Sequence, residues 1–148
     1  MSTKATSIAP AYSAEPLPVR HRILVAEDNA EMRRLISTTL GAQGYDVTEA
    51  RDGMELLDLI EAAARCGFPD RYAAVISDVR MPWLSGMDVL AVLNTASWST
   101  PVILITAFGD AETHLEGRAL GAAAVLDKPF EMDALTSTLA RVLAQRGR

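Results

Sequence analysis

The sequence is poor in cysteine, in basic clusters and in long apolar runs. Its 148 residues include one cysteine, Cys66, which cannot form an internal disulfide and suits a reducing cytoplasm. The formal net charge is -5, and the pairs His21-Arg22 and Arg33-Arg34 are too small to form the basic stripe of a nucleic-acid binder. No run approaches the roughly 20 apolar residues that span a bilayer, and no apolar signal-peptide core follows Lys4. We therefore expect a cytoplasmic protein that binds neither nucleic acid nor a membrane.

The length and composition predict one folded domain. A chain of 148 residues, 49% of them hydrophobic, can bury a substantial core. Residues 1–20 are rich in Ser, Thr, Ala and Pro, and such a segment cannot bury enough apolar surface to order itself. We expect a flexible tail over 1–20 and a single domain over 21–148. No output domain is expected after Arg148, so any signal should leave through protein contacts.

Five short apolar runs alternate with longer segments of helical period. This alternation predicts βαβ units with a parallel sheet. Most of the runs are continuously apolar, which is typical of strands that are covered on both faces, whereas the second run alternates and is expected at an edge. The predicted strands cover residues 22–27, 45–50, 72–77, 101–106 and 123–127.

The intervening segments carry apolar residues at helical spacing, which predicts one core-facing side on each helix. Asn29 and Asp52 are placed to cap helix N-termini, and Gly41, Gly44 and Gly121 supply the permissive backbone that helix ends require. The predicted core-facing stripes are Met32, Leu35, Ile36, Thr39 and Leu40; Met54, Leu57, Ile60 and Ala64; Val89, Val92 and Leu93; and Leu135, Leu139, Val142 and Leu143.

Polar residues stand at the C-terminal ends of four predicted strands. They are the pair Glu27-Asp28, then Asp78, Thr106 and Lys128. Because the carboxyl ends of parallel strands meet at one rim of the sheet, we expect these side chains to converge. Three crowded carboxylates repel one another, and a hard cation such as Mg²⁺ relieves that repulsion.

Such a site can take a phosphoryl group onto a carboxylate. Beside a cation, an oxygen of Asp78 can attack the group while Lys128 neutralises charge on the transferring oxygens. Thr106 can donate its hydroxyl to one of those oxygens, and the small Ala107 leaves room for the group to enter. The product is an aspartyl phosphate, a reactive adduct that suits a transient signal.

The chain resembles the receiver domains of two-component response regulators. The resemblance runs from about Arg22 to Leu143 and rests on the order of four strand-end motifs. These are Glu27-Asp28, Asp78-Val79-Arg80-Met81-Pro82 with Gly86, Thr106-Ala107, and Lys128-Pro129-Phe130. The resemblance implies an α/β, flavodoxin-like, doubly wound fold of five parallel strands in the order 2-1-3-4-5 with five helices.

The resemblance also implies a site and partners. Mg²⁺ would be held by Glu27, Asp28, Asp78 and the backbone carbonyl of Arg80, and the Lys128-Pro129 bond would be cis. A sensor histidine kinase or a histidine phosphotransfer protein would phosphorylate Asp78. The protein would then catalyse only its own phosphorylation and dephosphorylation, and would not be an enzyme in the usual sense.

Two stretches of the domain depart from the family pattern, and the first of them concerns signalling. Family members usually have an aromatic residue three positions before the lysine, which turns inward as the threonine moves, and together the two form the switch. In this chain the threonine is Thr106, and the position three residues before Lys128 is Val125. Valine is short and stiff at χ1, so Val125 cannot signal by a comparable ring rotation. The stretch from Leu59 to Arg71 is also longer than the family norm.

Other interpretations stay open at this point. A receiver could serve as a relay shuttle, a phosphate sink or an adaptor for an unknown downstream protein. An aspartate-nucleophile phosphohydrolase would usually have a second aspartate two residues after the nucleophile, where this chain has Arg80. A phosphorylation-independent docking module would use the acids only to bind metal. His21 and His114 are expected to be solvated rather than functional.

Overall fold

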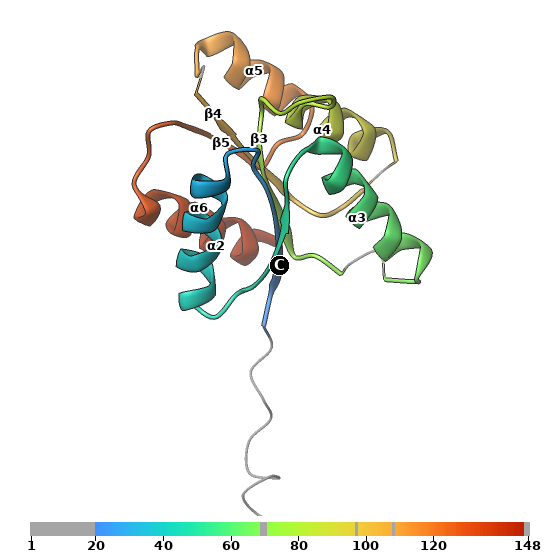
Figure 1. Ribbon diagram of the computed structural model, residues 1–148. Coiled ribbons are helices and arrows are strands. Elements are labelled where there is room, and N and C mark those ends of the chain that lie inside the picture. Colours follow the sequence, from blue (N-terminus) through green and yellow to red (C-terminus); the bar gives the residue numbers. More distant parts are fainter. Residues whose placement is uncertain (1–19, 69–70, 97, 108, 147–148) are drawn as a thin grey trace, which may run out of the picture.

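The computed structural model describes residues 20–68, 71–96, 98–107 and 109–146, which form five strands and five helices (Figure 1). The predicted tail over 1–20 lies outside the described residues except for Arg20. Within the described part of the chain, no helix is long and apolar enough to cross a membrane. The strands are β1 (Arg22–Ala26), β2 (Asp46–Ala50), β3 (Ala74–Asp78), β4 (Val102–Thr106) and β5 (Ala124–Asp127). The helices are α2 (Ala30–Ala42), α3 (Gly53–Arg65), α4 (Gly86–Thr95), α5 (Ala111–Ala119) and α6 (Met132–Arg146).

The strands form one parallel sheet in the order β2-β1-β3-β4-β5, which confirms the predicted topology and the edge position of the second strand. Helices cover both faces of this sheet (Figure 1). On one face, α2 and α6 bury Ile36, Leu40 and Leu139 against the isoleucines of the central strands. On the other face, α3 and α4 bury Leu56 and Leu90 against alternate strand residues. The two-sided burial explains why most strands read as continuously apolar.

The predicted helix caps are confirmed for α2 and α3. The Asn29 side chain accepts a hydrogen bond from the Met32 backbone N–H at 2.9 Å, and Asp52 caps α3 in the same way. Gly44 and Gly121 follow α2 and α5 with φ of 95° and 97°, a backbone that L-residues rarely adopt. Gly41 does not end a helix, because it lies within the last turn of α2.

Four residues of the predicted core-facing stripes, Leu35, Met54, Ala64 and Val92, are exposed, so those assignments were wrong. Leu35 and Met54 are each 49% exposed, and Val92 is 44% exposed. In α3 the buried residues are Gly53, Leu56, Ile60 and Ala63, which shifts most of the stripe by one position. The sequence has apolar neighbours at 56–57 and three alanines at 62–64, so its periodicity does not determine which side faces the core.

The loop between β3 and α4 folds back over the end of β3. The Gly86 N–H donates to the Val79 carbonyl at 2.9 Å, and a side chain at Gly86 would overlap the Asp78 carbonyl. A reciprocal pair of hydrogen bonds between Ser85 and Asp88 then starts α4. Within this loop Trp83 is 88% exposed and has φ of 72°, which is unusual for an aromatic residue. The close approach at Gly86 fixes the backbone around Asp78.

Candidate phosphoryl-acceptor and cation site

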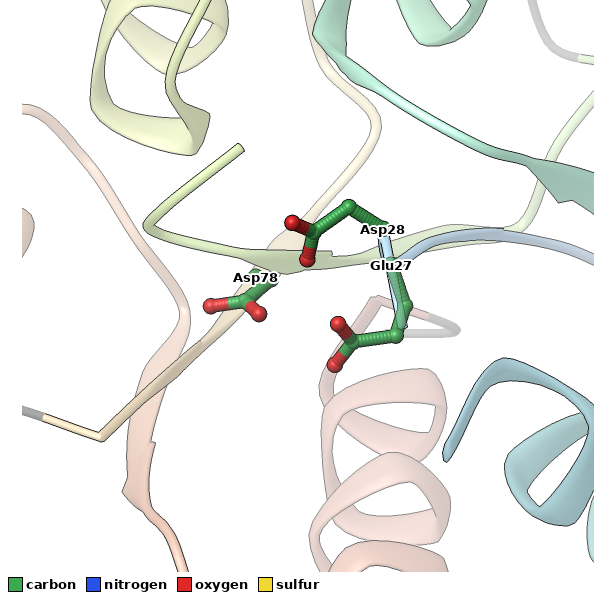
Figure 2. Close-up of side chains that lie close together, drawn as sticks. All are labelled: Glu27, Asp28 and Asp78. Carbon is green, nitrogen blue, oxygen red and sulfur yellow. The ribbon is translucent and has the colours of Figure 1, made fainter. Parts of the chain in front are cut away.

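Three carboxylates converge at the C-terminal rim of the sheet, as the strand-end pattern predicted. Glu27 and Asp28 follow β1, and Asp78 is the last residue of the neighbouring strand β3. One carboxylate oxygen from each residue lies within 4.8 Å of the other two, and Figure 2 shows the three side chains gathered at one place. Asp28 is exposed whereas Glu27 and Asp78 are buried, so the cluster is reached from solvent on the Asp28 side.

The ammonium group of Lys128 lies between two of these acids. Its Nζ donates to Glu27 Oε1 at 2.8 Å and to Asp78 Oδ2 at 2.9 Å. The side chain of Lys128 is 20% exposed, so much of this ion pair is shielded from water. The Lys128-Pro129 bond is cis, as the family resemblance implied. The fold therefore places Lys128 in contact with Asp78, although the two residues are 50 positions apart in the sequence.

Glu27 is 1% exposed, and this burial raises the pKa of its carboxyl group from 4.5 to about 7. Hydrogen bonds from Lys128 and from the Asn29 N–H lower the pKa, while nearby Asp78 raises it further. For Lys128, burial lowers the pKa, but the hydrogen bonds to Glu27 and Asp78 outweigh burial and raise it. The lysine therefore stays positively charged beside Asp78.

Asp78 is held by both of its carboxylate oxygens. One oxygen accepts from Lys128, and the other, Oδ1, accepts from the Arg80 backbone N–H at 3.2 Å. A cavity of about 610 Å³ adjoins the cluster on the side of Asp28 and Arg80, and Met81 and Met87 form part of its wall. Its volume provides room for a phosphoryl donor beside the acids. The role of the Arg80 backbone carbonyl as a ligand stays a prediction.

The two predicted switch residues lie on neighbouring strands. Thr106 is the buried last residue of β4, and its carbonyl accepts the Lys128 backbone N–H at 2.7 Å. Val125 on β5 is 8% exposed and faces Gly117 of α5. A Cβ at Gly117 would lie 3.1 Å from Val125 Cγ2 and 3.1 Å from Leu104 Cδ1. Helix α5 therefore packs closely against the sheet at Val125 and Leu104.

Some contacts at this rim were not predicted. His114 was expected to be solvated, but its side chain is 26% exposed and its Nε2 lies 2.9 Å from Asp127 Oδ1. The Asn29 backbone N–H donates to Glu27 Oε2 at 3.1 Å. Arg33 of α2 donates to the Glu27 carbonyl and to Glu49. These contacts depend on which side chains reach between separate elements, and no motif in the sequence signals them.

The donor set suits a magnesium ion. Carboxylate oxygens are hard ligands, and Mg²⁺ takes one or two of them together with waters and a phosphate oxygen. Glu27, Asp28 and Asp78 provide such oxygens in one cluster, with Asp28 open to solvent. The protein can therefore hold the cation directly beside the Asp78 carboxylate.

Comparison with known families supports the same interpretation. Residues 23–140 match the family described as the response regulator receiver domain. The chain is similar to the uncharacterized transcriptional regulatory protein YkoG of Bacillus subtilis, with 38% identity over 125 residues that cover 84% of this chain and 52% of YkoG. It is also similar to the transcriptional regulatory protein FixJ of Bradyrhizobium diazoefficiens, with 31% identity, covering 87% of this chain and 60% of FixJ. The chain thus spans between half and two thirds of the length of these two relatives.

Solved structures of receiver domains are similar to this chain over nearly their whole length. The receiver domain of the Francisella response regulator 1452 superposes with a TM-score of 0.78 at 31% identity, covering 86% of this chain and 99% of that one. The chemotaxis protein CheY4 of Vibrio cholerae superposes with a TM-score of 0.74 at 33% identity, covering 84% and 99%.

Proposed function

Because this chain belongs to the response regulator receiver domains, the phosphoryl-accepting domains of two-component systems, we propose that it accepts its phosphoryl group on Asp78. The observation that carries this proposal is the position of Lys128 Nζ, 2.9 Å from Asp78 Oδ2 and 2.8 Å from Glu27 Oε1. Receiver domains are phosphorylated on aspartate and bind Mg²⁺ at an acidic cluster. In this chain the cluster consists of Glu27, Asp28 and Asp78.

The chain's own residues account for the transfer step. An Asp78 oxygen forms a bond to phosphorus while the bond from phosphorus to the donor's nitrogen or oxygen breaks, and the donor leaves with that electron pair. Lys128 neutralises charge on the transferring oxygens, and Thr106 donates its hydroxyl to one of them. The Arg80 N–H at 3.2 Å keeps the Asp78 carboxylate oriented. Bound Mg²⁺ supplies further neutralisation of that charge.

The phosphoryl donor that we propose is a sensor histidine kinase or a histidine phosphotransfer protein, since receiver domains are phosphorylated by histidine kinases. The relatives YkoG and FixJ are named as transcriptional regulators and extend well beyond the part that this chain matches. For this chain we propose output through protein contacts, as a relay shuttle, a phosphate sink or an adaptor.

The phosphohydrolase alternative lacks its second acid. Arg80 stands two residues after Asp78, and its backbone N–H, not a carboxyl group, contacts the acceptor. Sustained turnover of a phosphate ester such as p-nitrophenyl phosphate would nevertheless reverse this judgement. A phosphorylation-independent docking module would instead bind its partner with an affinity that does not respond to a phosphoryl mimic such as beryllofluoride.

The test is the intact mass of the protein after incubation with acetyl phosphate and Mg²⁺. We expect one phosphoryl group on the wild type and none on the Asp78→Asn variant. Asp88→Asn is the matched control, because Asp88 is an exposed acid that lines the same cavity as Asp28. Phosphoryl uptake by Asp78→Asn, or no uptake by the wild type, would overturn the proposal.

A further inference from the structure

Arg33 of α2 connects the turn that carries Glu27 to the edge strand β2. Its hydrogen bonds go to the backbone carbonyl of Glu27 and to the side chain of Glu49. We propose that Arg33 is a positioning residue that fixes the turn from which Glu27 and Asp28 project, and so sets the affinity of the site for Mg²⁺. The inference rests on the proposed function only in taking Mg²⁺ as the cation of this site.

The guanidinium group of Arg33 is held at two points. Its Nη1 donates to the Glu27 carbonyl at 2.8 Å, and its Nε donates to Glu49 Oε1 on β2 at 3.0 Å. The Arg33 side chain is 14% exposed, whereas that of Glu49 is 45% exposed. The arginine therefore links α2, the edge strand β2 and the turn after β1 through one shielded group.

The carbonyl that Arg33 binds belongs to the peptide unit between Glu27 and Asp28. The Glu27 N–H donates to the Ala50 carbonyl at 3.2 Å, and its side chain is held by Lys128 and by the Asn29 N–H. Arg33 completes this set by fixing the plane of the peptide that leads to Asp28. Figure 2 shows the Glu27 and Asp28 side chains leaving this turn in different directions, so a rotation of the peptide would move one carboxylate relative to the other.

A guanidinium group suits this task better than an ammonium group. Its donors are spread over a rigid planar fork, so Nη1 and Nε can serve two acceptors that lie in different directions. Arg33 is also the fourth residue of α2, where the helix dipole disfavours a positive charge. The ion pair with Glu49 on β2 offsets that positive charge. The hydrogen bond to the Glu27 carbonyl is therefore the contact through which Arg33 acts on the site.

Charge and positioning predict opposite effects on cation binding. If Arg33 acted only through its positive charge, its removal would lessen repulsion and tighten Mg²⁺ binding. If Arg33 positions the turn, its removal will weaken Mg²⁺ binding, because partners that orient metal ligands typically contribute tenfold or more to affinity. The sign of the change therefore separates the two explanations.

The experiment is calorimetric titration of the full chain with MgCl₂ alone. We expect Arg33→Ala to bind Mg²⁺ about tenfold more weakly than the wild type, and Arg33→Lys to fall between them. Arg34→Ala is the matched control: it removes the same charge from the next, exposed residue of α2, and should stay within about twofold of the wild type because exposed charges are screened.

Unchanged or tighter binding by Arg33→Ala would overturn the inference. If Arg33→Ala does not fold in a thermal melt, Arg33→Lys decides the question, and an affinity equal to that of the wild type would count against positioning. Phosphoryl uptake from acetyl phosphate at saturating Mg²⁺ separates this inference from the proposed function. We expect uptake to recover in Arg33→Ala, whereas no uptake by the wild type would refute the function and leave the Mg²⁺ result standing.

Discussion

Raising the pH from about 5 to about 8 should destabilise this protein through one buried group, the carboxyl of Glu27. Burial raises its pKa from 4.5 to about 7. Between these values the folded protein keeps a proton that the unfolded chain releases. The stabilisation is therefore complete below about pH 4.5 and is lost as the pH rises through about 7. One pKa unit corresponds to about 1.4 kcal/mol, so the loss in unfolding free energy is roughly 3 kcal/mol.

Urea unfolding with a chelator present measures this loss in the wild type and in Glu27→Gln. Glutamine does not titrate, and its amide oxygen can still accept hydrogen bonds from Lys128 and the Asn29 N–H. The wild type should lose about 3 kcal/mol relative to Glu27→Gln over this range. Groups that do not interact with Glu27 contribute equally to both proteins and cancel in the difference. Glu31→Gln, at an exposed position of α2, should follow the wild-type curve.

An equal loss in Glu27→Gln would refute the reasoning, because the titrating group would then lie elsewhere. Mg²⁺ offers a second check on the same carboxyl group. A bound cation favours the charged form of Glu27 and should lower its pKa, so saturating Mg²⁺ should flatten the difference between the two proteins. If the difference persists with Mg²⁺, Glu27 does not belong to the cation site.

Substitutions at Lys128, Gly86 and Trp83 test the packing around the site by urea unfolding, with Gly41→Ala as a contrast. Above about pH 7, where Glu27 is charged, Lys128→Ala removes the countercharge of two buried carboxylates and should cost about 3 kcal/mol, partly recovered by Mg²⁺; an unchanged midpoint would argue against the ion pair. Gly86→Ala would overlap the Asp78 carbonyl and should cost more than about 2 kcal/mol, whereas Gly41→Ala, with open space around it in α2, should stabilise by about 0.5 to 1 kcal/mol. Trp83 has φ of 72°, so Trp83→Gly should be more stable than Trp83→Ala by about 1 kcal/mol, and equal stabilities would contradict strain there.

Most of the fold could be predicted because it follows from period and burial. The strands are continuously apolar where both faces are covered, and the alternating second strand lies at the edge. Which side of a helix faces the core was less certain. In α3 the adjacent Leu56 and Leu57 fit the helical pattern equally well, and only packing against the sheet selects Leu56 for burial.

The site was predictable to the extent that backbone topology determines it. Parallel strands bring Glu27, Asp78 and Lys128 to one rim whatever their spacing in the sequence. The contacts of Arg33 and of His114 were not predictable, although each joins a helix to the strand that follows it, because no residue pattern records which long side chain spans the gap between them. Such contacts depend on side-chain length and on the separation of packed elements, neither of which a one-dimensional pattern records.

The two outer strands of the sheet are poor templates for another polypeptide. β2 carries the exposed acids Asp46 and Glu49, and β5 has only four residues before the chain turns at Pro129. Charged and short edge strands discourage intermolecular strand pairing. Growth of the sheet into aggregates is therefore disfavoured at both margins, and any self-association of this chain is expected to use helical surfaces.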